Sequence, residues 1–282
     1  MNWNVPLKIL LLLSAGFLAA CSTVEGTGRA QLNMMSLDEE ISLGTSAYKE
    51  ALADETIIRK GPAARRVRMV GERIAAAANA RHPSIAGEFD WEFVLVDDDE
   101  IVNAWALPGG KCAVYSGMLR VARTDDMLAA VMGHEAAHAI ARHGGERLTQ
   151  SAVLGIATDI ALQDSAPGSR QAVMTAMGVG VVLPFSRMQE TEADYIGLFI
   201  SADAGYDPRG AVQLWEAMAE QGASSIEFLS THPSHGTRID ELEELMPRAM
   251  EVYENRMQVG LLEPVRLKEA TPSLPARKKN RK

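Results

Sequence analysis

The chain has 282 residues, of which 47% are hydrophobic and 23% are charged, and its formal net charge is -9. This composition is typical of a folded globular protein and is sufficient for one large domain or two small ones. The acidic balance argues against a nucleic-acid-binding protein, because the sequence has no evident basic surface outside its C-terminal tail. Aromatic residues make up only 5% of the chain and alanine is abundant, which favours a mostly helical fold.

Residues 1–20 predict a signal peptide rather than part of the fold. The apolar run from Ile9 to Ala20, about a dozen residues, is too short to span a bilayer and has the length of a signal-peptide core. It ends in Leu18-Ala-Ala-Cys21, which resembles the bacterial lipobox, where cleavage leaves the cysteine as a lipid-bearing N-terminus. The alternative is an ordinary signal peptide with an incidental cysteine.

Lipid on Cys21 would anchor the mature chain to a membrane surface rather than thread it through the bilayer. Ser22, and not an aspartate, follows the cysteine. By resemblance to lipoprotein sorting in Gram-negative bacteria, this favours the periplasmic side of the outer membrane, with the inner membrane as the alternative. Residues 21–35 are polar and contain glycine and threonine, so we expect a lipidated tether there.

Two helices should follow the tether. Ser36 and Glu39 have the spacing of a capping box, which predicts a helix over residues 36–53. A second helix is predicted over residues 61–80, with a proline at its tolerated first position. His82 comes after this helix, and we expect it at the surface rather than as a metal ligand.

The sequence then changes to strand patterns. Residues 89–96 alternate and are rich in phenylalanine, tryptophan and valine, which predicts a strand. Residues 103–119 contain two strand patterns separated by Pro-Gly-Gly, which predicts a β-hairpin. Cys112 lies in the second of these patterns, and we expect a buried and inert thiol because no base partner is visible for it.

Residues 126–143 predict a helix that contains no proline and ends at Gly144-Gly145. The helix contains His134-Glu-Ala-Ala-His138. Residues four apart project from the same face of a helix, so these two imidazoles have the geometry that one zinc ion needs. Glu135 is placed to act as a general base on a water that zinc has made acidic.

The alternative is that both histidines are ordinary polar residues on a helix surface. The flanking residues are apolar, however, which indicates a helix that is buried on much of its circumference: Leu128, Val131, Met132 and Ile140. Burying two imidazoles and a carboxylate without partners is unfavourable, and a bound metal ion removes that cost. Because a hairpin directly precedes this helix, we expect an edge strand that pairs with extended substrate, although a plain structural hairpin is the alternative.

The remainder of the chain is predicted to be helical up to its tail. The apolar segments 152–162 and 172–183 predict two short helices, because neither is long enough to span a membrane. A hairpin that dips into a membrane is the alternative. Further helices are predicted over residues 186–204, over residues 207–221 and after residue 238. From residue 268 the chain is rich in proline, lysine and arginine, and we expect disorder there.

Catalytic zinc takes three protein ligands and leaves one position for water, so a third ligand should come from another element. The remaining histidines are candidates, and so are Glu190 and Glu192. The chemistry of these residue types does not decide between them.

Four motifs occur in order along the chain. They are Asn103-Ala-Trp-Ala-Leu-Pro-Gly-Gly110, His134-Glu-Ala-Ala-His138, Ser186-Arg-Met-Gln-Glu190-Thr-Glu-Ala-Asp194, and Thr231-His-Pro233 with Arg238. Together they resemble the membrane-associated zinc peptidase family of the CAAX prenyl endopeptidases and HtpX, nearest its periplasmic BepA/LoiP-type lipoprotein proteases. The resemblance covers roughly residues 35–250. It implies an α+β, mostly helical, zincin-like metallopeptidase with a small β-sheet or hairpin beside the active-site helix.

The resemblance also implies roles for single residues. Glu190 would be the third zinc ligand, and Glu192 only a neighbour on a different helical face. Asp194 would accept a hydrogen bond from a zinc-ligating histidine. His232 would lie near the metal, where it could stabilise the oxyanion or act as a removable fourth ligand. Arg238 would orient the loop that carries His232.

Other residues receive weaker assignments. His143 and His235 match no role in the family and are expected to be structural or surface residues. The expected substrate edge strand comprises Asn103, Ala104, Pro108, Gly109 and Gly110.

We therefore expect a lipid-anchored periplasmic zinc metalloendopeptidase that hydrolyses unfolded or misassembled envelope proteins, holds one Zn²⁺ per chain and works with outer-membrane assembly machinery. A chaperone-like assembly factor with little proteolysis is the alternative, which the intact Glu135 disfavours. The Ser-Arg-x-x-Glu segment speaks against a zinc amidase. The expected organisation is a signal peptide at 1–20, a tether at 21–35, a metallopeptidase domain at 36–255 and a C-terminal extension with a disordered basic tail at 256–282.

Overall fold

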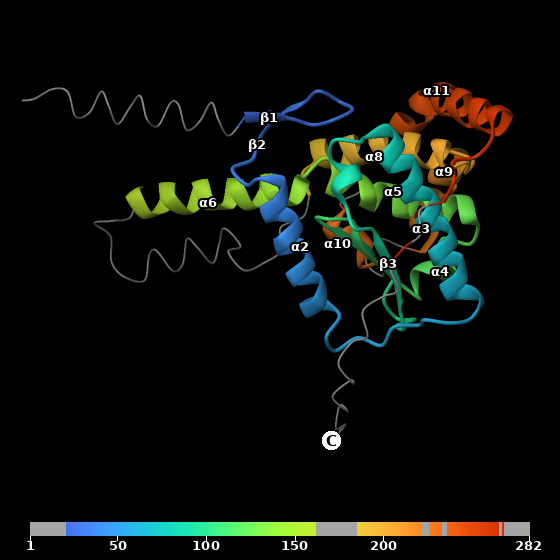
Figure 1. Cartoon of the computed structure of the whole chain (residues 1–282), viewed down its shortest axis with the longest axis horizontal. Helices are drawn as coiled ribbons and strands as arrows, with labels where there is room; N and C mark the ends of the chain where they lie inside the picture. Colours follow the sequence, from blue (N-terminus) through green and yellow to red (C-terminus); the bar gives the residue numbers. More distant parts are fainter. Residues whose placement is uncertain (1–20, 162–184, 222–225, 233–235, 265–266, 268–282) are drawn as a thin grey trace, which may run out of the picture.

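The computed structural model describes residues 21–161, 185–221, 226–232, 236–264 and 267. The described residues fold as helices around a three-stranded sheet, with a separate two-stranded hairpin near the N-terminal end, which confirms the mostly helical α+β class (Figure 1). In chain order the elements are β1 (Cys21–Thr23), β2 (Ala30–Leu32), α2 (Leu37–Ala51), α3 (Pro62–Arg81), the short 3₁₀ helix η1 (Ala86–Glu88), β3 (Glu92–Val96), β4 (Ala104–Leu107), β5 (Lys111–Tyr115), α4 (Met118–Val121), α5 (Asp125–Ile140), α6 (His143–Ala161), α8 (Arg187–Asp203), α9 (Arg209–Gln221), α10 (Phe228–Thr231) and α11 (Arg238–Val259).

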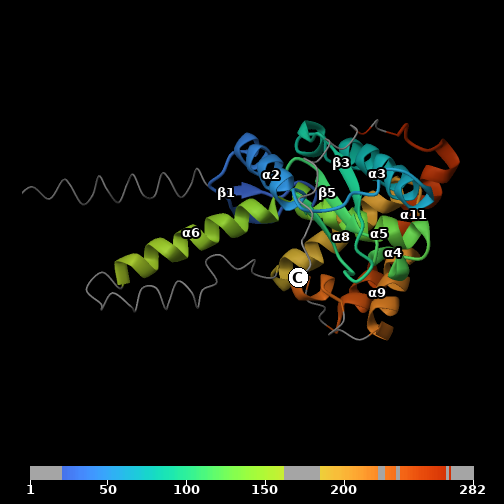
Figure 2. The same cartoon turned by 90° about the horizontal axis from the view of Figure 1, so that it is seen from below.

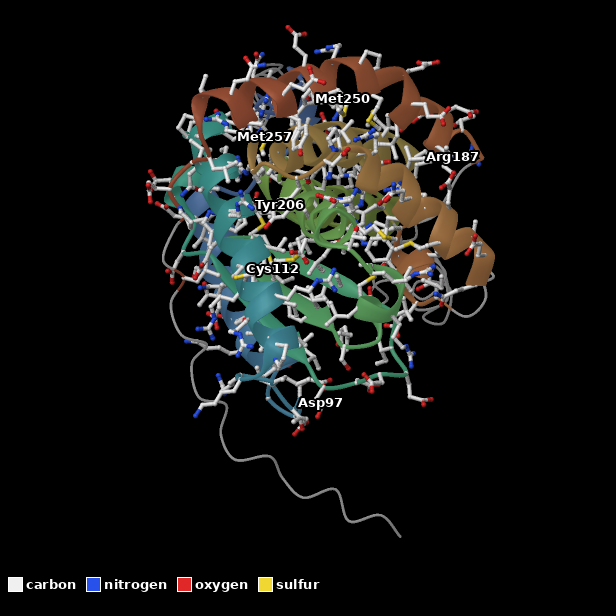
Figure 3. The ribbon with its side chains drawn as sticks, turned by 90° about the vertical axis from the view of Figure 1, so that its right-hand side faces the viewer. Asp97, Cys112, Arg187, Tyr206, Met250 and Met257 are labelled. Carbon is white, nitrogen blue, oxygen red and sulfur yellow. The ribbon has the colours of Figure 1, made fainter. Side chains whose placement is uncertain are left out.

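Helix α5 is the central element of the fold. Thr124 caps its N-terminus by accepting a hydrogen bond from the Met127 amide, and nearly every side chain after that is buried. Helices α3, α8 and α9 pack around it, and α11 lies across the outer side of α8 (Figures 1 and 3). The helix that carries the paired histidines is therefore buried by neighbouring helices on several sides, as its apolar flanking residues predict.

Two glycines let α5 and α8 approach closely beside His134. A Cβ atom on Gly197 would lie 2.7 Å from the backbone nitrogen of His134, and one on Gly133 would lie 2.5 Å from Ser201 Oγ. Real side chains do not tolerate such contacts, so the crossing requires glycine at both positions. The crossing places α8, with Glu190 in its first turn, directly against the histidine helix.

The sheet has the order β3-β5-β4, with β3 parallel to β5 and β4 antiparallel to it. The expected hairpin is therefore confirmed, and β4 forms one edge of the sheet. Cys112 in β5 is 2% exposed and lies within the core (Figure 3). Burial raises the pKa of the Cys112 thiol well above its usual value, which agrees with an inert thiol.

Residues 21–35 are more structured than the expected tether. Strands β1 and β2 pair as an antiparallel hairpin that lies beside α6 (Figure 1), and Gln31 and Asn33 are buried. The expectation that His82 is a surface residue is wrong, because its side chain is 2% exposed. A Cβ atom on Gly26 would lie only 2.6 Å from the His82 ring, so the hairpin itself covers this histidine.

The helix of the paired histidines ends earlier than predicted. Helix α5 stops at Ile140 and α6 starts at His143, with Arg142 between them at φ 59°. Gly144-Gly145 therefore lies in the first turn of α6 instead of ending α5. A Cβ atom on Gly145 would lie 2.1 Å from Glu40 Oε1, so glycine is needed there for packing.

Helix α6 extends away from the rest of the folded body in both views (Figures 1 and 2). The apolar segment expected as a separate short helix from residue 152 is instead the second half of α6, which continues to Ala161. The second apolar segment, 172–183, lies outside the described residues. Among the described helices, none combines the length and the hydropathy that a membrane crossing requires.

The capping box predicted at Ser36 is confirmed, and the structure adds a second one at Ser186. Ser36 and Glu39 form the capping box of α2, and Ser186 and Gln189 form one at the start of α8. Helix α11 continues to Val259, past residue 255, where the metallopeptidase domain was expected to end. The basic tail from residue 268 lies outside the described residues.

Candidate metal centre

His134 and His138 point into one buried cluster with two residues from other elements. Their Nε2 atoms lie 3.1 Å apart, and both side chains are less than 7% exposed. Glu190 from α8 reaches the pair, with Oε1 at 3.4 Å from His138 Nε2 and Oε2 at 3.5 Å from His134 Nε2. The fourth member is His232, at the C-terminus of α10.

The spacing of these atoms fits a zinc ion. Tetrahedral zinc with bonds of about 2.0–2.1 Å holds its ligand atoms about 3.3–3.4 Å apart. The distances among the two imidazoles and the carboxylate, 3.1 to 3.5 Å, lie on both sides of that value. Two neutral imidazoles and one carboxylate are also a donor set that catalytic zinc uses.

His232 lies close to where a fourth tetrahedral ligand would stand. Its Nδ1 lies 3.1 Å from Glu190 Oε1 and 3.3 Å from His134 Nε2. The ring stacks against Phe228 at 4.4 Å and Phe185 at 5.2 Å between centroids, which fixes its plane. The expectation that His232 lies near the metal is thus consistent with the geometry, and its position resembles that of a fourth ligand.

The Nδ1 atom of His134, which is not the one nearest Glu190, faces Asp194, as the resemblance implies. His134 Nδ1 lies 2.9 Å from Asp194 Oδ1, which is the contact that orients a metal-bound imidazole. Most of the loop that Arg238 was expected to orient, residues 233–235, lies outside the described residues, so that role stays a prediction. Arg238 donates to Glu190 Oε2 at 2.8 Å and to Asp194 Oδ1 at 2.7 Å, and its guanidinium lies 3.7 Å from the centroid of the Trp215 ring.

The second nitrogen of His138 faces His143, which sequence reasoning treated as a structural or surface residue. His143 is fully buried, and its Nδ1 lies 2.8 Å from His138 Nδ1. Its Nε2 lies 3.0 Å from Glu192 Oε2. Helical spacing could not reveal this contact, because the break at Arg142 lies between the two histidines. Glu192 does lie on a different face of α8 from Glu190, as predicted.

Glu135 lies between the cluster and the edge strand β4. Its Oε2 accepts a hydrogen bond from the Ala106 amide at 3.1 Å. Its Oε1 is buried, lies 3.3 Å from His232 Nε2 and has no hydrogen-bond partner among the described residues. Burial raises the pKa of the Glu135 carboxyl above its ordinary value. A carboxyl with a raised pKa and a free oxygen is suited to accept a proton.

The electrostatics of the cluster agree with metal binding. Burial lowers the pKa of His138 well below its usual range, so this imidazole is neutral at neutral pH. Burial acts in the same direction on His134, but hydrogen bonds to Asp194 and Glu190 raise its pKa to about 9. Burial opposes ionisation of Glu190, yet contacts with the three imidazoles lower its pKa. Because a metal ligand must be deprotonated, binding of a cation at this site would release a proton from His134.

The residues expected to form the substrate edge divide into two groups. Ala104 belongs to β4, and the Asn103 side chain next to it accepts a hydrogen bond from the Ala104 amide at 2.8 Å. The turn Pro108-Gly109-Gly110 packs against α2 instead, where a Cβ atom on Gly44 would lie 2.2 Å from the Pro108 carbonyl oxygen. Cys21 starts β1, and His235 lies outside the described residues.

An HExxH helix, a carboxylate on a following helix that reaches both of its histidines and an edge strand beside Glu135 define a zinc-dependent metallopeptidase of the zincin type. Comparison with known proteins identifies the family of this metallopeptidase. The family model of peptidase family M48 matches residues 62–246, and the chain belongs to that family.

Several known proteins are similar in sequence to most of this chain. Mitochondrial metalloendopeptidase OMA1 of Schizosaccharomyces pombe is 37% identical over 79% of this chain and 66% of its own length, and that of Saccharomyces cerevisiae is 31% identical over 80% and 69%. The beta-barrel assembly-enhancing protease of Escherichia coli is 27% identical over 80% of this chain and 48% of its own length. The chain thus spans about two thirds of the yeast proteins and about half of the bacterial one.

Proposed function

We propose that this chain is a lipid-anchored zinc metalloendopeptidase that cleaves unfolded or misassembled envelope proteins on the periplasmic side of the outer membrane. The observation that carries the proposal is the placement of Glu135. One of its oxygens accepts a hydrogen bond from the edge strand, and the other faces the cluster, 3.3 Å from His232 Nε2. A carboxylate held in this way between the edge strand and the cluster is placed to accept a proton from a water at the metal site.

In this proposal His134, His138 and Glu190 hold the zinc ion. When bound there, zinc polarises the scissile carbonyl and makes water acidic enough to be deprotonated near neutral pH. Glu135 accepts the proton from the attacking water through Oε1 and passes it to the leaving amine. The fixed contact between Oε2 and the Ala106 amide keeps the carboxylate in place during both transfers.

The backbone of β4 is proposed to bind the substrate. This strand pairs with β5 on one side and forms the edge of the described sheet on the other. An extended peptide can add to such an edge through main-chain hydrogen bonds, which read little of the side-chain sequence. Unfolded chains of mixed sequence therefore fit this edge. Because the Pro108 turn packs on α2, we confine the substrate-binding part of the hairpin to Ala104–Leu107.

His232 is proposed to restrain the resting site. Its Nδ1 stands beside the three proposed ligand atoms, and its Nε2 lies 3.3 Å from the free oxygen of Glu135. A side chain in this position competes with both water and substrate. Turnover would require the ring to move aside, after which it could donate a hydrogen bond to the oxyanion.

The compartment is proposed from the leader sequence. The lipobox-like Leu18-Ala-Ala-Cys21 supports a lipid anchor on Cys21, and one bacterial relative is named a beta-barrel assembly-enhancing protease. The OMA1 relatives are mitochondrial, so they do not distinguish between the two bacterial membranes. Outer-membrane assembly machinery is the partner that the proposal favours. A chaperone-like assembly factor with little proteolysis is the competing function.

Comparison of envelope proteomes tests this proposal. Cells carrying the wild-type chain and cells carrying Glu135→Gln would be compared for envelope proteins that accumulate and for peptide fragments that disappear. The proposal expects intact misassembled envelope proteins to accumulate in the variant. Identical proteomes would favour the assembly factor, because binding does not need the base.

A further inference from the structure

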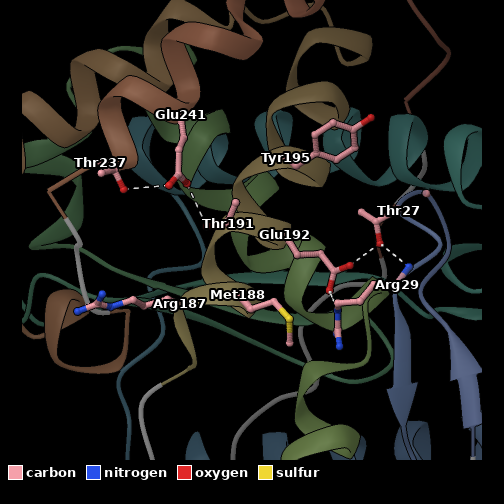
Figure 4. Close-up of a pocket in the computed structure, with 10 residues that line it drawn as sticks. Thr27, Arg29, Arg187, Met188, Thr191, Glu192, Tyr195, Thr237 and Glu241 are labelled. Atoms are coloured by element: carbon pink, nitrogen blue, oxygen red, sulfur yellow. Dashed lines mark hydrogen bonds and ion pairs between the residues drawn. The ribbon is translucent and has the colours of Figure 1, made fainter.

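A buried hydrogen-bonded series leads from His138 to the N-terminal hairpin. His138 Nδ1 contacts His143 Nδ1 at 2.8 Å, and His143 Nε2 contacts Glu192 Oε2 at 3.0 Å. Glu192 in turn accepts hydrogen bonds from Arg29 Nε at 2.7 Å and from the Thr27 hydroxyl (Figure 4). The series therefore joins the connection between β1 and β2, α8 and the start of α6 to one of the proposed zinc ligands.

Chemistry allows one arrangement of protons along this series once Nε2 of His138 faces a metal. The hydrogen of His138 is then on Nδ1, and it donates to His143 Nδ1. His143 must accept at Nδ1, so its own hydrogen is on Nε2 and donates to Glu192 Oε2. Glu192 acts only as an acceptor, which is the role of a carboxylate. Each donor in the series meets one acceptor, and the tautomer of His138 is thereby fixed.

The outer end of the series is held by charge. Arg29 donates through Nη1 and Nη2 to both oxygens of Glu146, each at 2.9 Å, in addition to its contact with Glu192. Gln189 donates to Glu146 Oε2 at 2.8 Å. The side chains of Glu146 and Glu192 are 4% and 5% exposed, so removal of the guanidinium would leave two buried carboxylates without their cation.

We propose that His143 and Glu192 are positioning residues for the metal ligand His138, and that Arg29 of the N-terminal hairpin completes this support. A carboxylate therefore supports the Nδ1 hydrogen of both histidines. Asp194 contacts His134 directly, whereas Glu192 acts on His138 through the imidazole of His143. The inference rests on the proposed function, because it takes His138 to be a zinc ligand. It makes the hairpin directly after Cys21 a part of the metal site.

Zinc affinity of the purified full chain tests the inference. His143→Leu removes the acceptor for His138 Nδ1, whereas His143→Gln supplies a carbonyl oxygen that can replace it. Loss of an outer-shell partner typically weakens metal affinity about 10–100-fold. We expect a loss in this range for His143→Leu and Glu192→Gln in competition with a chelator, with His143→Gln closer to wild type.

A matched control separates positioning from general stability. Glu40 is as buried as Glu192 and pairs with Arg142 at 2.8 Å near the start of α6. Within the described ranges, this pair makes no hydrogen bond or ion pair with His134, His138, Glu190 or His232. Glu40→Gln should lower the thermal midpoint of the metal-free chain and leave zinc affinity unchanged. Arg29→Gln is the milder variant if a buried substitution prevents folding, and it too should weaken zinc binding.

The absorption spectrum of the Co²⁺-substituted chain gives a second readout, because it reports the ligand geometry. The His143 and Glu192 variants should alter this spectrum and Glu40→Gln should not. Unchanged spectra together with zinc affinities that fall no further than that of Glu40→Gln would overturn the inference and leave the proposed function intact. A wild-type chain that binds no zinc would overturn both.

Discussion

Two acidic residues only two positions apart on α8 serve different histidines. Glu190 faces His134 and His138, whereas Glu192 faces His143 and Arg29. Helical geometry predicts that residues two apart point in different directions, but it does not say which direction leads to the metal. The family motif supplied that choice, and the distances agree with it.

A pair of substitutions tests this division. Glu190→Gln removes a proposed ligand, so we expect the purified chain to retain much less than one zinc after dialysis. The Glu192→Gln variant should still bind one zinc per chain when zinc is in excess, because Glu192 acts on the ligand His138 only through His143. Metal analysis of the two variants decides the matter. Full occupancy in Glu190→Gln with loss in Glu192→Gln would reverse the assignment.

The role of His232 is a second question at this scale. Since its ring stands beside the proposed ligand atoms and the free oxygen of Glu135, His232→Ala should open the site, and turnover should rise. Cleavage of an unfolded protein at matched zinc content measures this. A fall of about 100-fold would indicate that the oxyanion contact dominates. Equal rates would show that the side chain neither restrains nor assists.

At the scale of elements, helices that carry their own caps were predictable from sequence. The capping box of Ser36 and Glu39 and the hairpin turn at Pro108 act locally, so their residue types are sufficient evidence. The end of α5 was not predictable in the same way. Arg142 adopts its left-handed conformation while it donates to Glu40 and to the Met35 carbonyl, which are more than 100 residues earlier in the chain.

The N-terminal hairpin shows the same limit. Its sequence is polar, and polarity alone predicts a tether. The hairpin is ordered because Arg29 meets Glu146 and Glu192, which lie 117 and 163 residues further along the chain. The burial of His82 beneath Gly26 depends on this docking as well. Contacts of such long range leave no periodic signal in a single sequence.

The crossing of α5 and α8 supports a prediction on stability. A Cβ atom on Gly197 would clash with the His134 backbone, so Gly197→Ala should destabilise the fold by about 1–3 kcal/mol. Gly87→Ala is the control, because a Cβ atom there meets nothing within 4 Å. Thermal unfolding of the two metal-free variants measures the difference. Equal thermal midpoints for the two variants would mean that α5 and α8 can move apart without loss of stability.

At the scale of the whole molecule, the described body combines one catalytic centre with an N-terminal segment that is docked onto it. Residues 1–20 lie outside the described part, so the anchor is a proposal from the sequence. Cys21→Ala should prevent lipidation and move the chain out of the membrane fraction. Cell fractionation and mass spectrometry of the mature N-terminus would check this. A native N-terminus at a residue other than Cys21 would rule out the lipoprotein assignment.

The central claim is that Glu135 activates water for peptide hydrolysis. Glu135→Gln preserves the size of the side chain and removes its ability to accept a proton. A general base contributes about 10²- to 10⁴-fold to a rate. The direct measurement is cleavage of an unfolded protein by purified wild-type and Glu135→Gln chains, each shown to hold one zinc. The account predicts that the variant keeps its zinc and loses at least about 100-fold in turnover. Equal turnover at equal zinc content would contradict it.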